Sequence, residues 1–284
     1  DWLEENDSYH PFLLWLDFFD PHEPWDPPEY MVRKYDPDYG RTPMLHPNYG
    51  RATDYTPGEL RNLRAHYCAE AELVDRWVGR VLDKIDDLGL WENTAVIFTT
   101  DHGIALGDHN RTGKTNINSN DDRIWPLYPE IAHIPFLISV PGVSGGQTVD
   151  TFAQPADILP TLLELGGVDV TPPEPFHGRS FAAQLRGETE SPIRDFAVTG
   201  SFLRPQDGRI GSTATTPMVY TGEWAYAPFG TDGEPELFDR ADDPGEETNA
   251  IAAHRDAAER LHEQMMEWLR QHGAPDETVA LYAR

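Results

Sequence analysis

The chain has 284 residues with 49 acidic and 22 basic side chains, which give a formal net charge of −27. Such a surface repels phosphate backbones and anionic lipids, so it argues against nucleic acid and membrane surfaces as partners. No apolar stretch approaches the roughly 20 residues that a membrane-spanning helix needs. A single cysteine, Cys68, excludes a framework of intrachain disulfides. With 39% hydrophobic residues spread along its length, the chain is expected to be globular with a sizeable core.

Lysine is scarce: only Lys34, Lys84 and Lys114 occur among the basic residues. A strongly acidic, lysine-poor surface is best tolerated where salt screens it, since the Debye length falls to about 3 Å at 1 M. The composition therefore favours a halophilic host with an acidic proteome. An ordinary acidic protein is the alternative.

The first predicted element is a strand over residues 12–19, which are almost wholly apolar. It runs into residues 20–28, where four prolines forbid a helix or a central strand. His22 is thereby presented on a stiff loop at a strand's end, either for function or only to brace the turn. The stretch from this loop to about Tyr55 has no clear period, and we expect it to be irregular.

A long helix is predicted next. Thr56, Pro57 and Glu59 form an N-cap, a first-turn proline and a capping-box partner. Apolar residues then recur every three or four positions until Gly89 ends the pattern. A β-branched run over residues 94–100 predicts a strand buried on both faces.

Asp101, His102 and Gly103 follow that strand directly. Strand, helix and strand form a right-handed crossover, which would bring His22 and Asp101 to one edge of a parallel sheet. An adjacent Asp and His can bind a metal, relay a proton or only cap the next turn.

The later elements are shorter. We expect a strand at residues 134–140, a helix at 157–165, a small antiparallel sheet from segments 196–199, 218–226 and 236–238, and a last helix at about 255–272. The change in character near residue 191 predicts two parts. Residues 1–190 would be the later part of a catalytic domain, and residues 191–284 an α+β subdomain packed on it.

Several segments, in this order, resemble the sulfatase branch of the alkaline-phosphatase-like superfamily, and the resemblance covers nearly the whole chain. They are residues 18–25, 100–109 followed by Lys114, 133–142, 157–161, 177–180 and 236–249. The resemblance implies an α/β fold with a mostly parallel sheet flanked by helices, plus a small C-terminal antiparallel sheet and helix.

The resemblance also implies roles for four residues. Asp101 and His102 would be metal ligands, and His22 and Lys114 would be catalytic residues that hold the oxygens of a sulfate ester. The physical chemistry agrees, because a sulfuryl group under attack carries dispersed negative charge that preorganised cations and donors stabilise. His22 could also protonate the leaving oxygen.

One part of the family pattern is absent. Sulfatases of this type use a cysteine or serine converted to formylglycine in a CxPSR-type motif. No such motif occurs here, and Cys68 is predicted to be a small buried hydrophobe in the middle of a helix. The two aspartates that complete the family's metal site are also missing. We therefore expect a fragment that resembles the C-terminal two-thirds, with the formylglycine encoded upstream and no sulfatase activity in the isolated chain.

The expected cofactor is a divalent metal, Ca²⁺ first. Calcium prefers oxygen ligands, so the imidazole of His102 keeps Mn²⁺ and Zn²⁺ open. The expected substrate is a small-molecule or carbohydrate sulfate ester. A phosphonate or phosphodiester hydrolase of the same superfamily is the first alternative, and a non-catalytic truncated homologue that acts as a binding module is the second. Oligomeric state is open, and the absence of a visible export signal slightly favours the cytoplasm.

Overall fold

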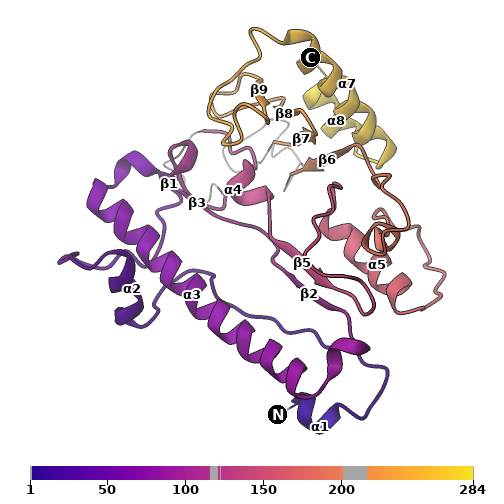
Figure 1. Ribbon diagram of the computed structural model, residues 1–284. Coiled ribbons are helices and arrows are strands. Elements are labelled where there is room, and N and C mark those ends of the chain that lie inside the picture. Colours follow the sequence, from indigo (N-terminus) through magenta and orange to yellow (C-terminus); the bar gives the residue numbers. More distant parts are fainter. Residues whose placement is uncertain (1, 116–120, 122, 201–215, 284) are drawn as a thin grey trace. The chain divides into compact units, whose positions relative to one another are not determined.

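The computed structural model describes residues 2–115, 121, 123–200 and 216–283 (Figure 1). The chain forms two compact units. The first consists of residues 1–96, 105–113 and 139–142, and the second of residues 97–104, 114–138 and 143–284. The domain boundary expected near residue 190 falls inside the second unit, and a division there stays a prediction.

The first unit is mostly helical. Its elements are α1 (Trp2–Asn6), α2 (Glu29–Tyr35), β1 (Gly50–Arg51), η1 (Ala52–Asp54), α3 (Pro57–Asp87), η2 (Leu90–Glu92), β3 (Ala105–Leu106), η3 (Asp108–Asn110) and β4 (Arg111–Gly113). The three short strands form an antiparallel sheet in the order β1-β4-β3.

Helix α3 begins and ends where the sequence predicted. The Glu59 backbone N–H donates to the Thr56 hydroxyl at 3.3 Å, and the Thr56 backbone N–H donates to Glu59 Oε2 at 2.8 Å. This reciprocal capping box satisfies two amides that a helix start leaves without partners. The helix stops before Gly89, which takes a φ of +65° that glycine adopts without steric cost.

Helix α2 lies in the stretch that was expected to be irregular, so that expectation was wrong there. Pro28 precedes it with a φ of −51°, and Glu29 pairs with Arg33 at 2.6 Å across one turn. Met31 and Val32 are buried against α3, and this packing stabilises the helix. Seven residues after a run of prolines are too few to show a helical period.

Residues 12–19 do not form the predicted strand, because no strand in the described part of the chain pairs with them. The first four residues of the segment still alternate as a strand would, whereas residues 16–19 are all exposed. Phe12 and Leu14 pack against a cluster that contains Ile85, whereas Leu13 and Trp15 are 80% and 78% exposed. The crossover expected from this segment through α3 to the next strand is therefore not formed in the described residues.

The two strands predicted around residues 94–100 and 134–140 are confirmed in shortened form. They are β2 (Val96–Thr99) and β5 (Phe136–Ser139), which pair as a two-stranded sheet. The burial on both faces expected for residues 94–100 is not found, because Phe98 is 40% exposed. In β5, Leu137 is 59% exposed.

The second unit contains the rest of the chain. Besides most of β2 and β5, its elements are α4 (Pro129–Ala132), η4 (Pro155–Asp157), α5 (Ile158–Leu165), α6 (Ala182–Leu185), β6 (Phe196–Thr199), β7 (Met218–Thr221), β8 (Trp224–Ala227), β9 (Glu236–Asp239), α7 (Arg255–Gln271) and α8 (Asp276–Tyr282). The expected helix at 157–165 and the small antiparallel sheet are both confirmed. The sheet has the order β6-β7-β8-β9, because the single segment expected at 218–226 forms two strands, β7 and β8.

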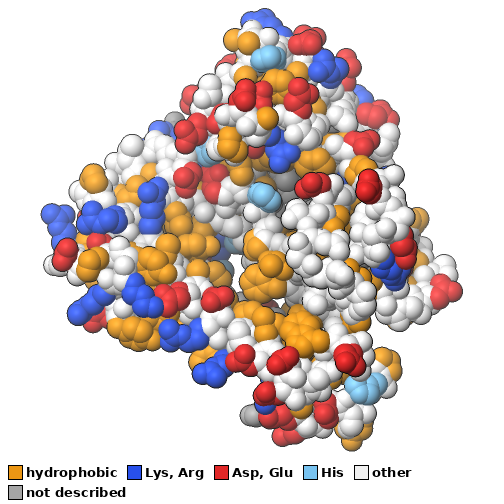
Figure 2. Space-filling model, viewed as in Figure 1, with side chains coloured by type: hydrophobic (Ala, Val, Ile, Leu, Met, Phe, Trp, Pro, Cys, Tyr) orange, Lys and Arg blue, Asp and Glu red, His pale blue; other side chains and the backbone are white. Residues whose placement is uncertain are grey.

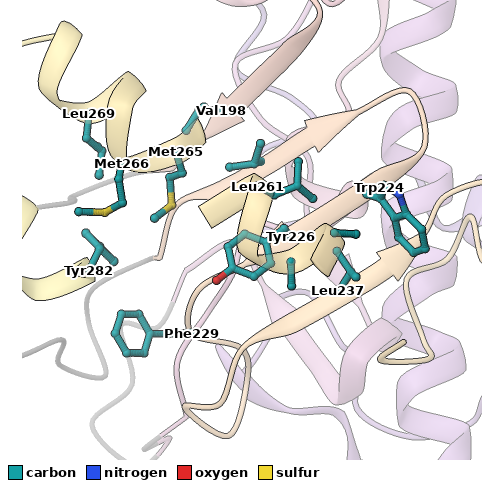
Figure 3. Close-up of a cluster of buried hydrophobic side chains, with 13 residues drawn as sticks. Val198, Trp224, Tyr226, Phe229, Leu237, Leu261, Met265, Met266, Leu269 and Tyr282 are labelled. Atoms are coloured by element: carbon teal, nitrogen blue, oxygen red, sulfur yellow. The ribbon is translucent and has the colours of Figure 1, made fainter. Parts of the chain in front are cut away.

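The main core of the second unit lies between this sheet and α7 (Figure 3). The sheet contributes Trp224, Tyr226 and Leu237, and α7 contributes Leu261 and Met265, among others. These helix positions are four residues apart and lie on one face, as the sequence predicted for the last helix. This shared hydrophobic core therefore stabilises the C-terminal sheet and α7 together.

Acidic side chains are common on the surfaces of both units (Figure 2). Some are paired with arginines one helical turn away, as in Arg260–Asp256 at 3.1 Å. The halophilic origin stays a prediction. Within the described ranges, no helix combines the length and the apolar character that crossing a bilayer requires.

Candidate functional site

The Asp101-His102 pair leaves the end of β2 as the sequence predicted. Asp101 Oδ1 accepts the His102 backbone N–H at 2.9 Å, which fixes one edge of the carboxylate. The His102 ring contacts the Gly103 carbonyl through Nδ1 at 2.9 Å, and its Nε2 lies 3.6 Å from Asp101 Oδ2. Both side chains are accessible, with Asp101 83% and His102 40% exposed.

This geometry decides which atoms can bind a metal. A carbonyl oxygen only accepts, so Nδ1 of His102 must carry the proton that it shares with Gly103, and neutral Nε2 keeps its lone pair. Metal-binding histidines are commonly oriented by such a bond from the other nitrogen. Asp101 Oδ2 and His102 Nε2 therefore fit one side of a metal shell. The described residues contain no group of three or more His, Cys, Asp or Glu that could hold a metal.

Gly103 completes the motif for a steric reason. Its backbone N–H donates to the Ile131 carbonyl at 2.9 Å, and a Cβ at this position would overlap the carbonyl oxygen of Glu130. The turn after Asp101 and His102 thus packs directly against the backbone of α4. A side chain at residue 103 would push the two polar residues away from their present positions.

We predict that Gly103→Ala lowers the free energy of unfolding by about 1–3 kcal/mol, the usual cost of overpacking. Urea denaturation followed by tryptophan fluorescence measures it. Gly79→Ala is the matched control, because nothing lies within 4 Å of a Cβ there and alanine in a helix interior is worth about 0.5–1 kcal/mol over glycine. Equal effects of the two changes would contradict the steric explanation.

His22 lies on the proline-rich loop of the first unit. Its Nδ1 contacts the Glu23 carbonyl at 2.7 Å, so here too Nδ1 is the donor and Nε2 faces away from this bond. The side chain is 43% exposed, whereas the Glu23 carboxylate, 3.7 Å from Nδ1, is almost wholly buried. Trp25 anchors the loop: it is fully buried and its indole N–H donates to the Pro21 carbonyl at 2.9 Å.

Lys114 directly follows β4 and is half-buried. Asp101, His102 and Lys114 belong to the second unit and His22 to the first, so their predicted convergence stays a prediction. The oxygen-rich run from Asn116 to Asp122, a candidate for a second cation or only a solvated loop, lies outside the described residues except for Asp121.

The comparisons with known proteins bear on the whole chain. The profile of the family described as "Sulfatase" matches residues 1–168, which is more than half of the chain. The chain belongs to the sulfatase family. A second profile, described as "N-sulphoglucosamine sulphohydrolase, C-terminal", matches residues 120–273 of this chain.

Individual relatives agree. Arylsulfatase K of Rattus norvegicus is 27% identical over 294 residues, which cover 93% of this chain and 50% of that protein. The chain thus spans about half the length of this curated relative. The solved structure of yidJ from Bacteroides fragilis, described as a candidate sulfatase, matches with a TM-score of 0.72 and 26% identity over 100% of this chain and 58% of that one.

A third match has a different activity in its name. The phosphonate monoester hydrolase of Agrobacterium radiobacter has a TM-score of 0.64 and 26% identity, over 93% of this chain and 57% of that one. Together these structures confirm the predicted alkaline-phosphatase-like α/β class for this chain.

The single cysteine of the chain, Cys68, lies within α3, as predicted, and is half-buried. Burial raises the pKa of the Cys68 thiol. The thiolate is the nucleophilic form of cysteine, so this environment disfavours a nucleophilic role and agrees with a small packed side chain.

Two segments that resemble the sulfatase pattern meet at one buried carboxylate. Asp157 is fully buried, and its Oδ1 accepts the Arg179 backbone N–H at 2.7 Å. A Cβ on Gly178 would overlap the backbone of Ala156, so this approach requires glycine. Arg194 supplies the counter-charge to Asp157, a contact that sequence reasoning missed because the two residues are distant along the chain.

Proposed function

We propose that this chain is part of a metal-dependent sulfatase that hydrolyses a sulfate monoester. In this proposal Asp101 and His102 are metal ligands, and His22 and Lys114 hold the sulfate oxygens. The observation that carries it is the pair at the end of β2, where Asp101 Oδ2 and His102 Nε2, 3.6 Å apart, are the exposed polar atoms of a segment that the sulfatase profile matches.

The chemistry assigns a task to each residue. Water and the ester react to give an alcohol and sulfate, with one S–O bond broken and one formed. Negative charge spreads over the sulfuryl oxygens in the transition state, and the Lys114 ammonium stabilises it as a point charge. The metal, when bound, supplies Lewis acidity at those oxygens.

His22 is proposed to donate the proton that the leaving oxygen takes up. Its Nδ1–H is held by the Glu23 carbonyl, so the proton available for transfer is the one on Nε2 of the imidazolium. Because a poor leaving group gains most from protonation, His22 matters more for alkyl and sugar sulfates than for activated aryl sulfates.

The metal is proposed to be Ca²⁺. Asp101 supplies a hard oxygen ligand of the kind that calcium prefers, whereas His102 supplies nitrogen, which suits Mn²⁺ or Zn²⁺ better. Isothermal titration of the protein with each of the three ions separates these possibilities. Asp101→Asn and His102→Gln should each weaken binding of the preferred ion if both are ligands.

The substrate is proposed to be a small-molecule or carbohydrate sulfate ester. A phosphonate or phosphodiester hydrolase of the same superfamily is the second candidate, and the structural match to the Agrobacterium enzyme is compatible with it. The deciding experiment assays the protein encoded by the complete reading frame, beside the 284-residue chain, on paired aryl sulfate and aryl phosphonate substrates. In the complete protein, we expect kcat/KM for the aryl sulfate to be higher than kcat/KM for the aryl phosphonate. A higher value for the phosphonate would favour the second candidate, and no turnover of either ester would favour a non-catalytic binding module.

A further inference from the structure

The C-terminal sheet is covered on both of its faces, because side chains alternate between the two faces along each strand. One face packs against α7 (Figure 3). The opposite face carries Met218, Tyr220, Ala225, Ala227 and Phe238. Tyr128, which directly precedes α4, completes this second cluster and is only 1% exposed. The second face of the sheet therefore holds the start of α4.

The hydroxyl of Tyr128 is fixed by two polar side chains. Tyr128 donates its proton to Glu236 Oε2 at 2.6 Å, and the Thr231 hydroxyl lies 2.8 Å from the phenol oxygen. Because a phenol has one proton, Thr231 is the donor in this second contact. The Thr231 backbone N–H donates to Glu236 Oε1 at 3.0 Å. Both oxygens of Glu236 thus accept hydrogen bonds, as suits an ionised carboxylate, and bonds to a charged acceptor are the stronger ones.

Gly230 leaves the room that this carboxylate needs. A Cβ on Gly230 would lie 2.0 Å from Cδ of Glu236, which is too close for any real contact. The Gly230 N–H donates to the Glu234 carbonyl at 2.7 Å and closes the loop between β8 and β9. This loop therefore brings Thr231 and Glu236 together at the Tyr128 hydroxyl.

A second tyrosine ties the same segment to the sheet. Tyr220, on β7, donates its hydroxyl proton to the Leu127 carbonyl at 3.0 Å. Burial first, and then the charge of Glu246, raise the pKa of Tyr220 well above its ordinary value, so the hydroxyl keeps the proton that it donates. Leu127 and Tyr128 are adjacent, and the two tyrosines therefore fix the chain directly before α4.

Helix α4 in turn supports the turn that carries Asp101 and His102. The Ile131 backbone N–H donates to the Tyr128 carbonyl at 2.9 Å. The Ile131 carbonyl accepts the backbone N–H of Gly103, also at 2.9 Å. A continuous path of hydrogen bonds thus leads from the C-terminal sheet, through Tyr128 and Ile131, to the residue after His102.

We propose that Tyr128 is a positioning residue for the Asp101-His102 pair: its hydroxyl ties α4 to the C-terminal sheet and thereby holds the turn in which the pair lies. The role of the pair as metal ligands rests on the proposed function, whereas the tie itself rests on these contacts alone. The C-terminal sheet thus sets the geometry of a pair that comes from an earlier part of the chain.

Hydrogen exchange of the Gly103 amide in the 284-residue chain tests the tie. We expect Tyr128→Phe, which keeps the ring and removes the hydroxyl, to speed this exchange about tenfold or more, since a hydrogen bond to a charged group is lost. Tyr226→Phe is the matched control, because it removes a hydroxyl that lies 3.0 Å from His262 Nδ1 on the α7 face of the same sheet. Unchanged Gly103 exchange in Tyr128→Phe, or an equal rise in both variants, overturns the proposal.

Metal affinity of the complete protein tests the consequence for the site. For whichever of Ca²⁺, Mn²⁺ and Zn²⁺ the wild type binds most tightly, Tyr128→Phe should raise Kd about threefold or more, below the roughly 10- to 100-fold effect of a group bonded to a ligand itself. Tyr226→Phe should leave Kd unchanged. An unchanged Kd in Tyr128→Phe contradicts the positioning role even if Gly103 exchange is faster.

The two measurements also separate the tie from the proposed function. A wild type that binds none of the three ions refutes the assigned metal site and leaves Gly103 exchange to decide the tie. If Tyr128→Phe does not fold, Tyr220→Phe takes its place in both measurements, because it removes the bond to the adjacent Leu127 carbonyl. The same two outcomes then confirm or overturn the proposal.

Discussion

Lys114→Ala is expected to lower kcat of the complete protein toward a sulfate monoester by about 100- to 1,000-fold, the usual effect of removing one group that stabilises transition-state charge. Lys114 is one of only three lysines in a chain of net charge −27. The Lys114 ammonium beside the sulfuryl group would therefore offset the repulsion that the other, mostly acidic, side chains exert on an anionic substrate. Steady-state kinetics with an aryl sulfate measure the change, and KM should rise much less than kcat falls.

The matched control for this change is Lys34→Ala. Lys34 is 48% exposed and pairs with Glu72 on the surface of α3, and such pairs are worth about 0–1 kcal/mol. Lys34→Ala removes one positive charge, as Lys114→Ala does, but leaves the proposed site unchanged. Because salt screens an effect of net charge, kcat of Lys34→Ala should stay within about twofold of the wild-type value. An equal loss in both variants would show that net charge, and not the position of Lys114, controls the rate.

The elements that were predicted correctly depend on signals close together in the sequence. Helix α3 has its capping box within four residues, from Thr56 to Glu59. The segment expected at 218–226 was found, but its division into the hairpin of β7 and β8 was not predicted. The strand predicted at residues 12–19 was wrong because a strand needs hydrogen-bonding partners that are distant along the chain, and the local sequence does not show them. The apolar pattern was right about which side chains pack, as Phe12 and Leu14 show, but not about the pairing.

The same limit applies to the site. The position of Asp101 and His102 after a strand followed from the sequence, whereas the roles of these two residues, of Lys114 and of His22 came from the resemblance to sulfatases and stay predictions. The burial of Glu70 was missed because one acid in a helix has no pattern of its own; the signal was its place between Ala69 and Ala71 on the buried side of α3.

The buried carboxylate of Asp157 should be the most sensitive acidic position for folding. Asp157→Ala is expected to lower the free energy of unfolding by about 3–5 kcal/mol, because it leaves the Arg194 guanidinium without its buried partner. Arg194 Nη2 donates to Asp157 Oδ1 at 2.5 Å, and the Gln154 backbone N–H donates to Oδ2 at 2.7 Å. Urea denaturation of the 284-residue chain, followed by tryptophan fluorescence, measures the loss.

The control and the pH dependence test the electrostatic origin of this effect. Asp256→Ala removes a carboxylate from an exposed pair with Arg260 and should cost no more than about 0.5 kcal/mol. Burial alone would raise the pKa of Asp157, but hydrogen bonds from Arg194 and from backbone amides outweigh it and hold the pKa below its ordinary value of 3.8. The carboxylate therefore stabilises the fold above about pH 4, and this contribution is lost as pH falls through its lower pKa in the folded state. The difference between wild type and Asp157→Ala should shrink on acidification, and a difference that stays constant down to pH 2 would assign the loss to packing instead.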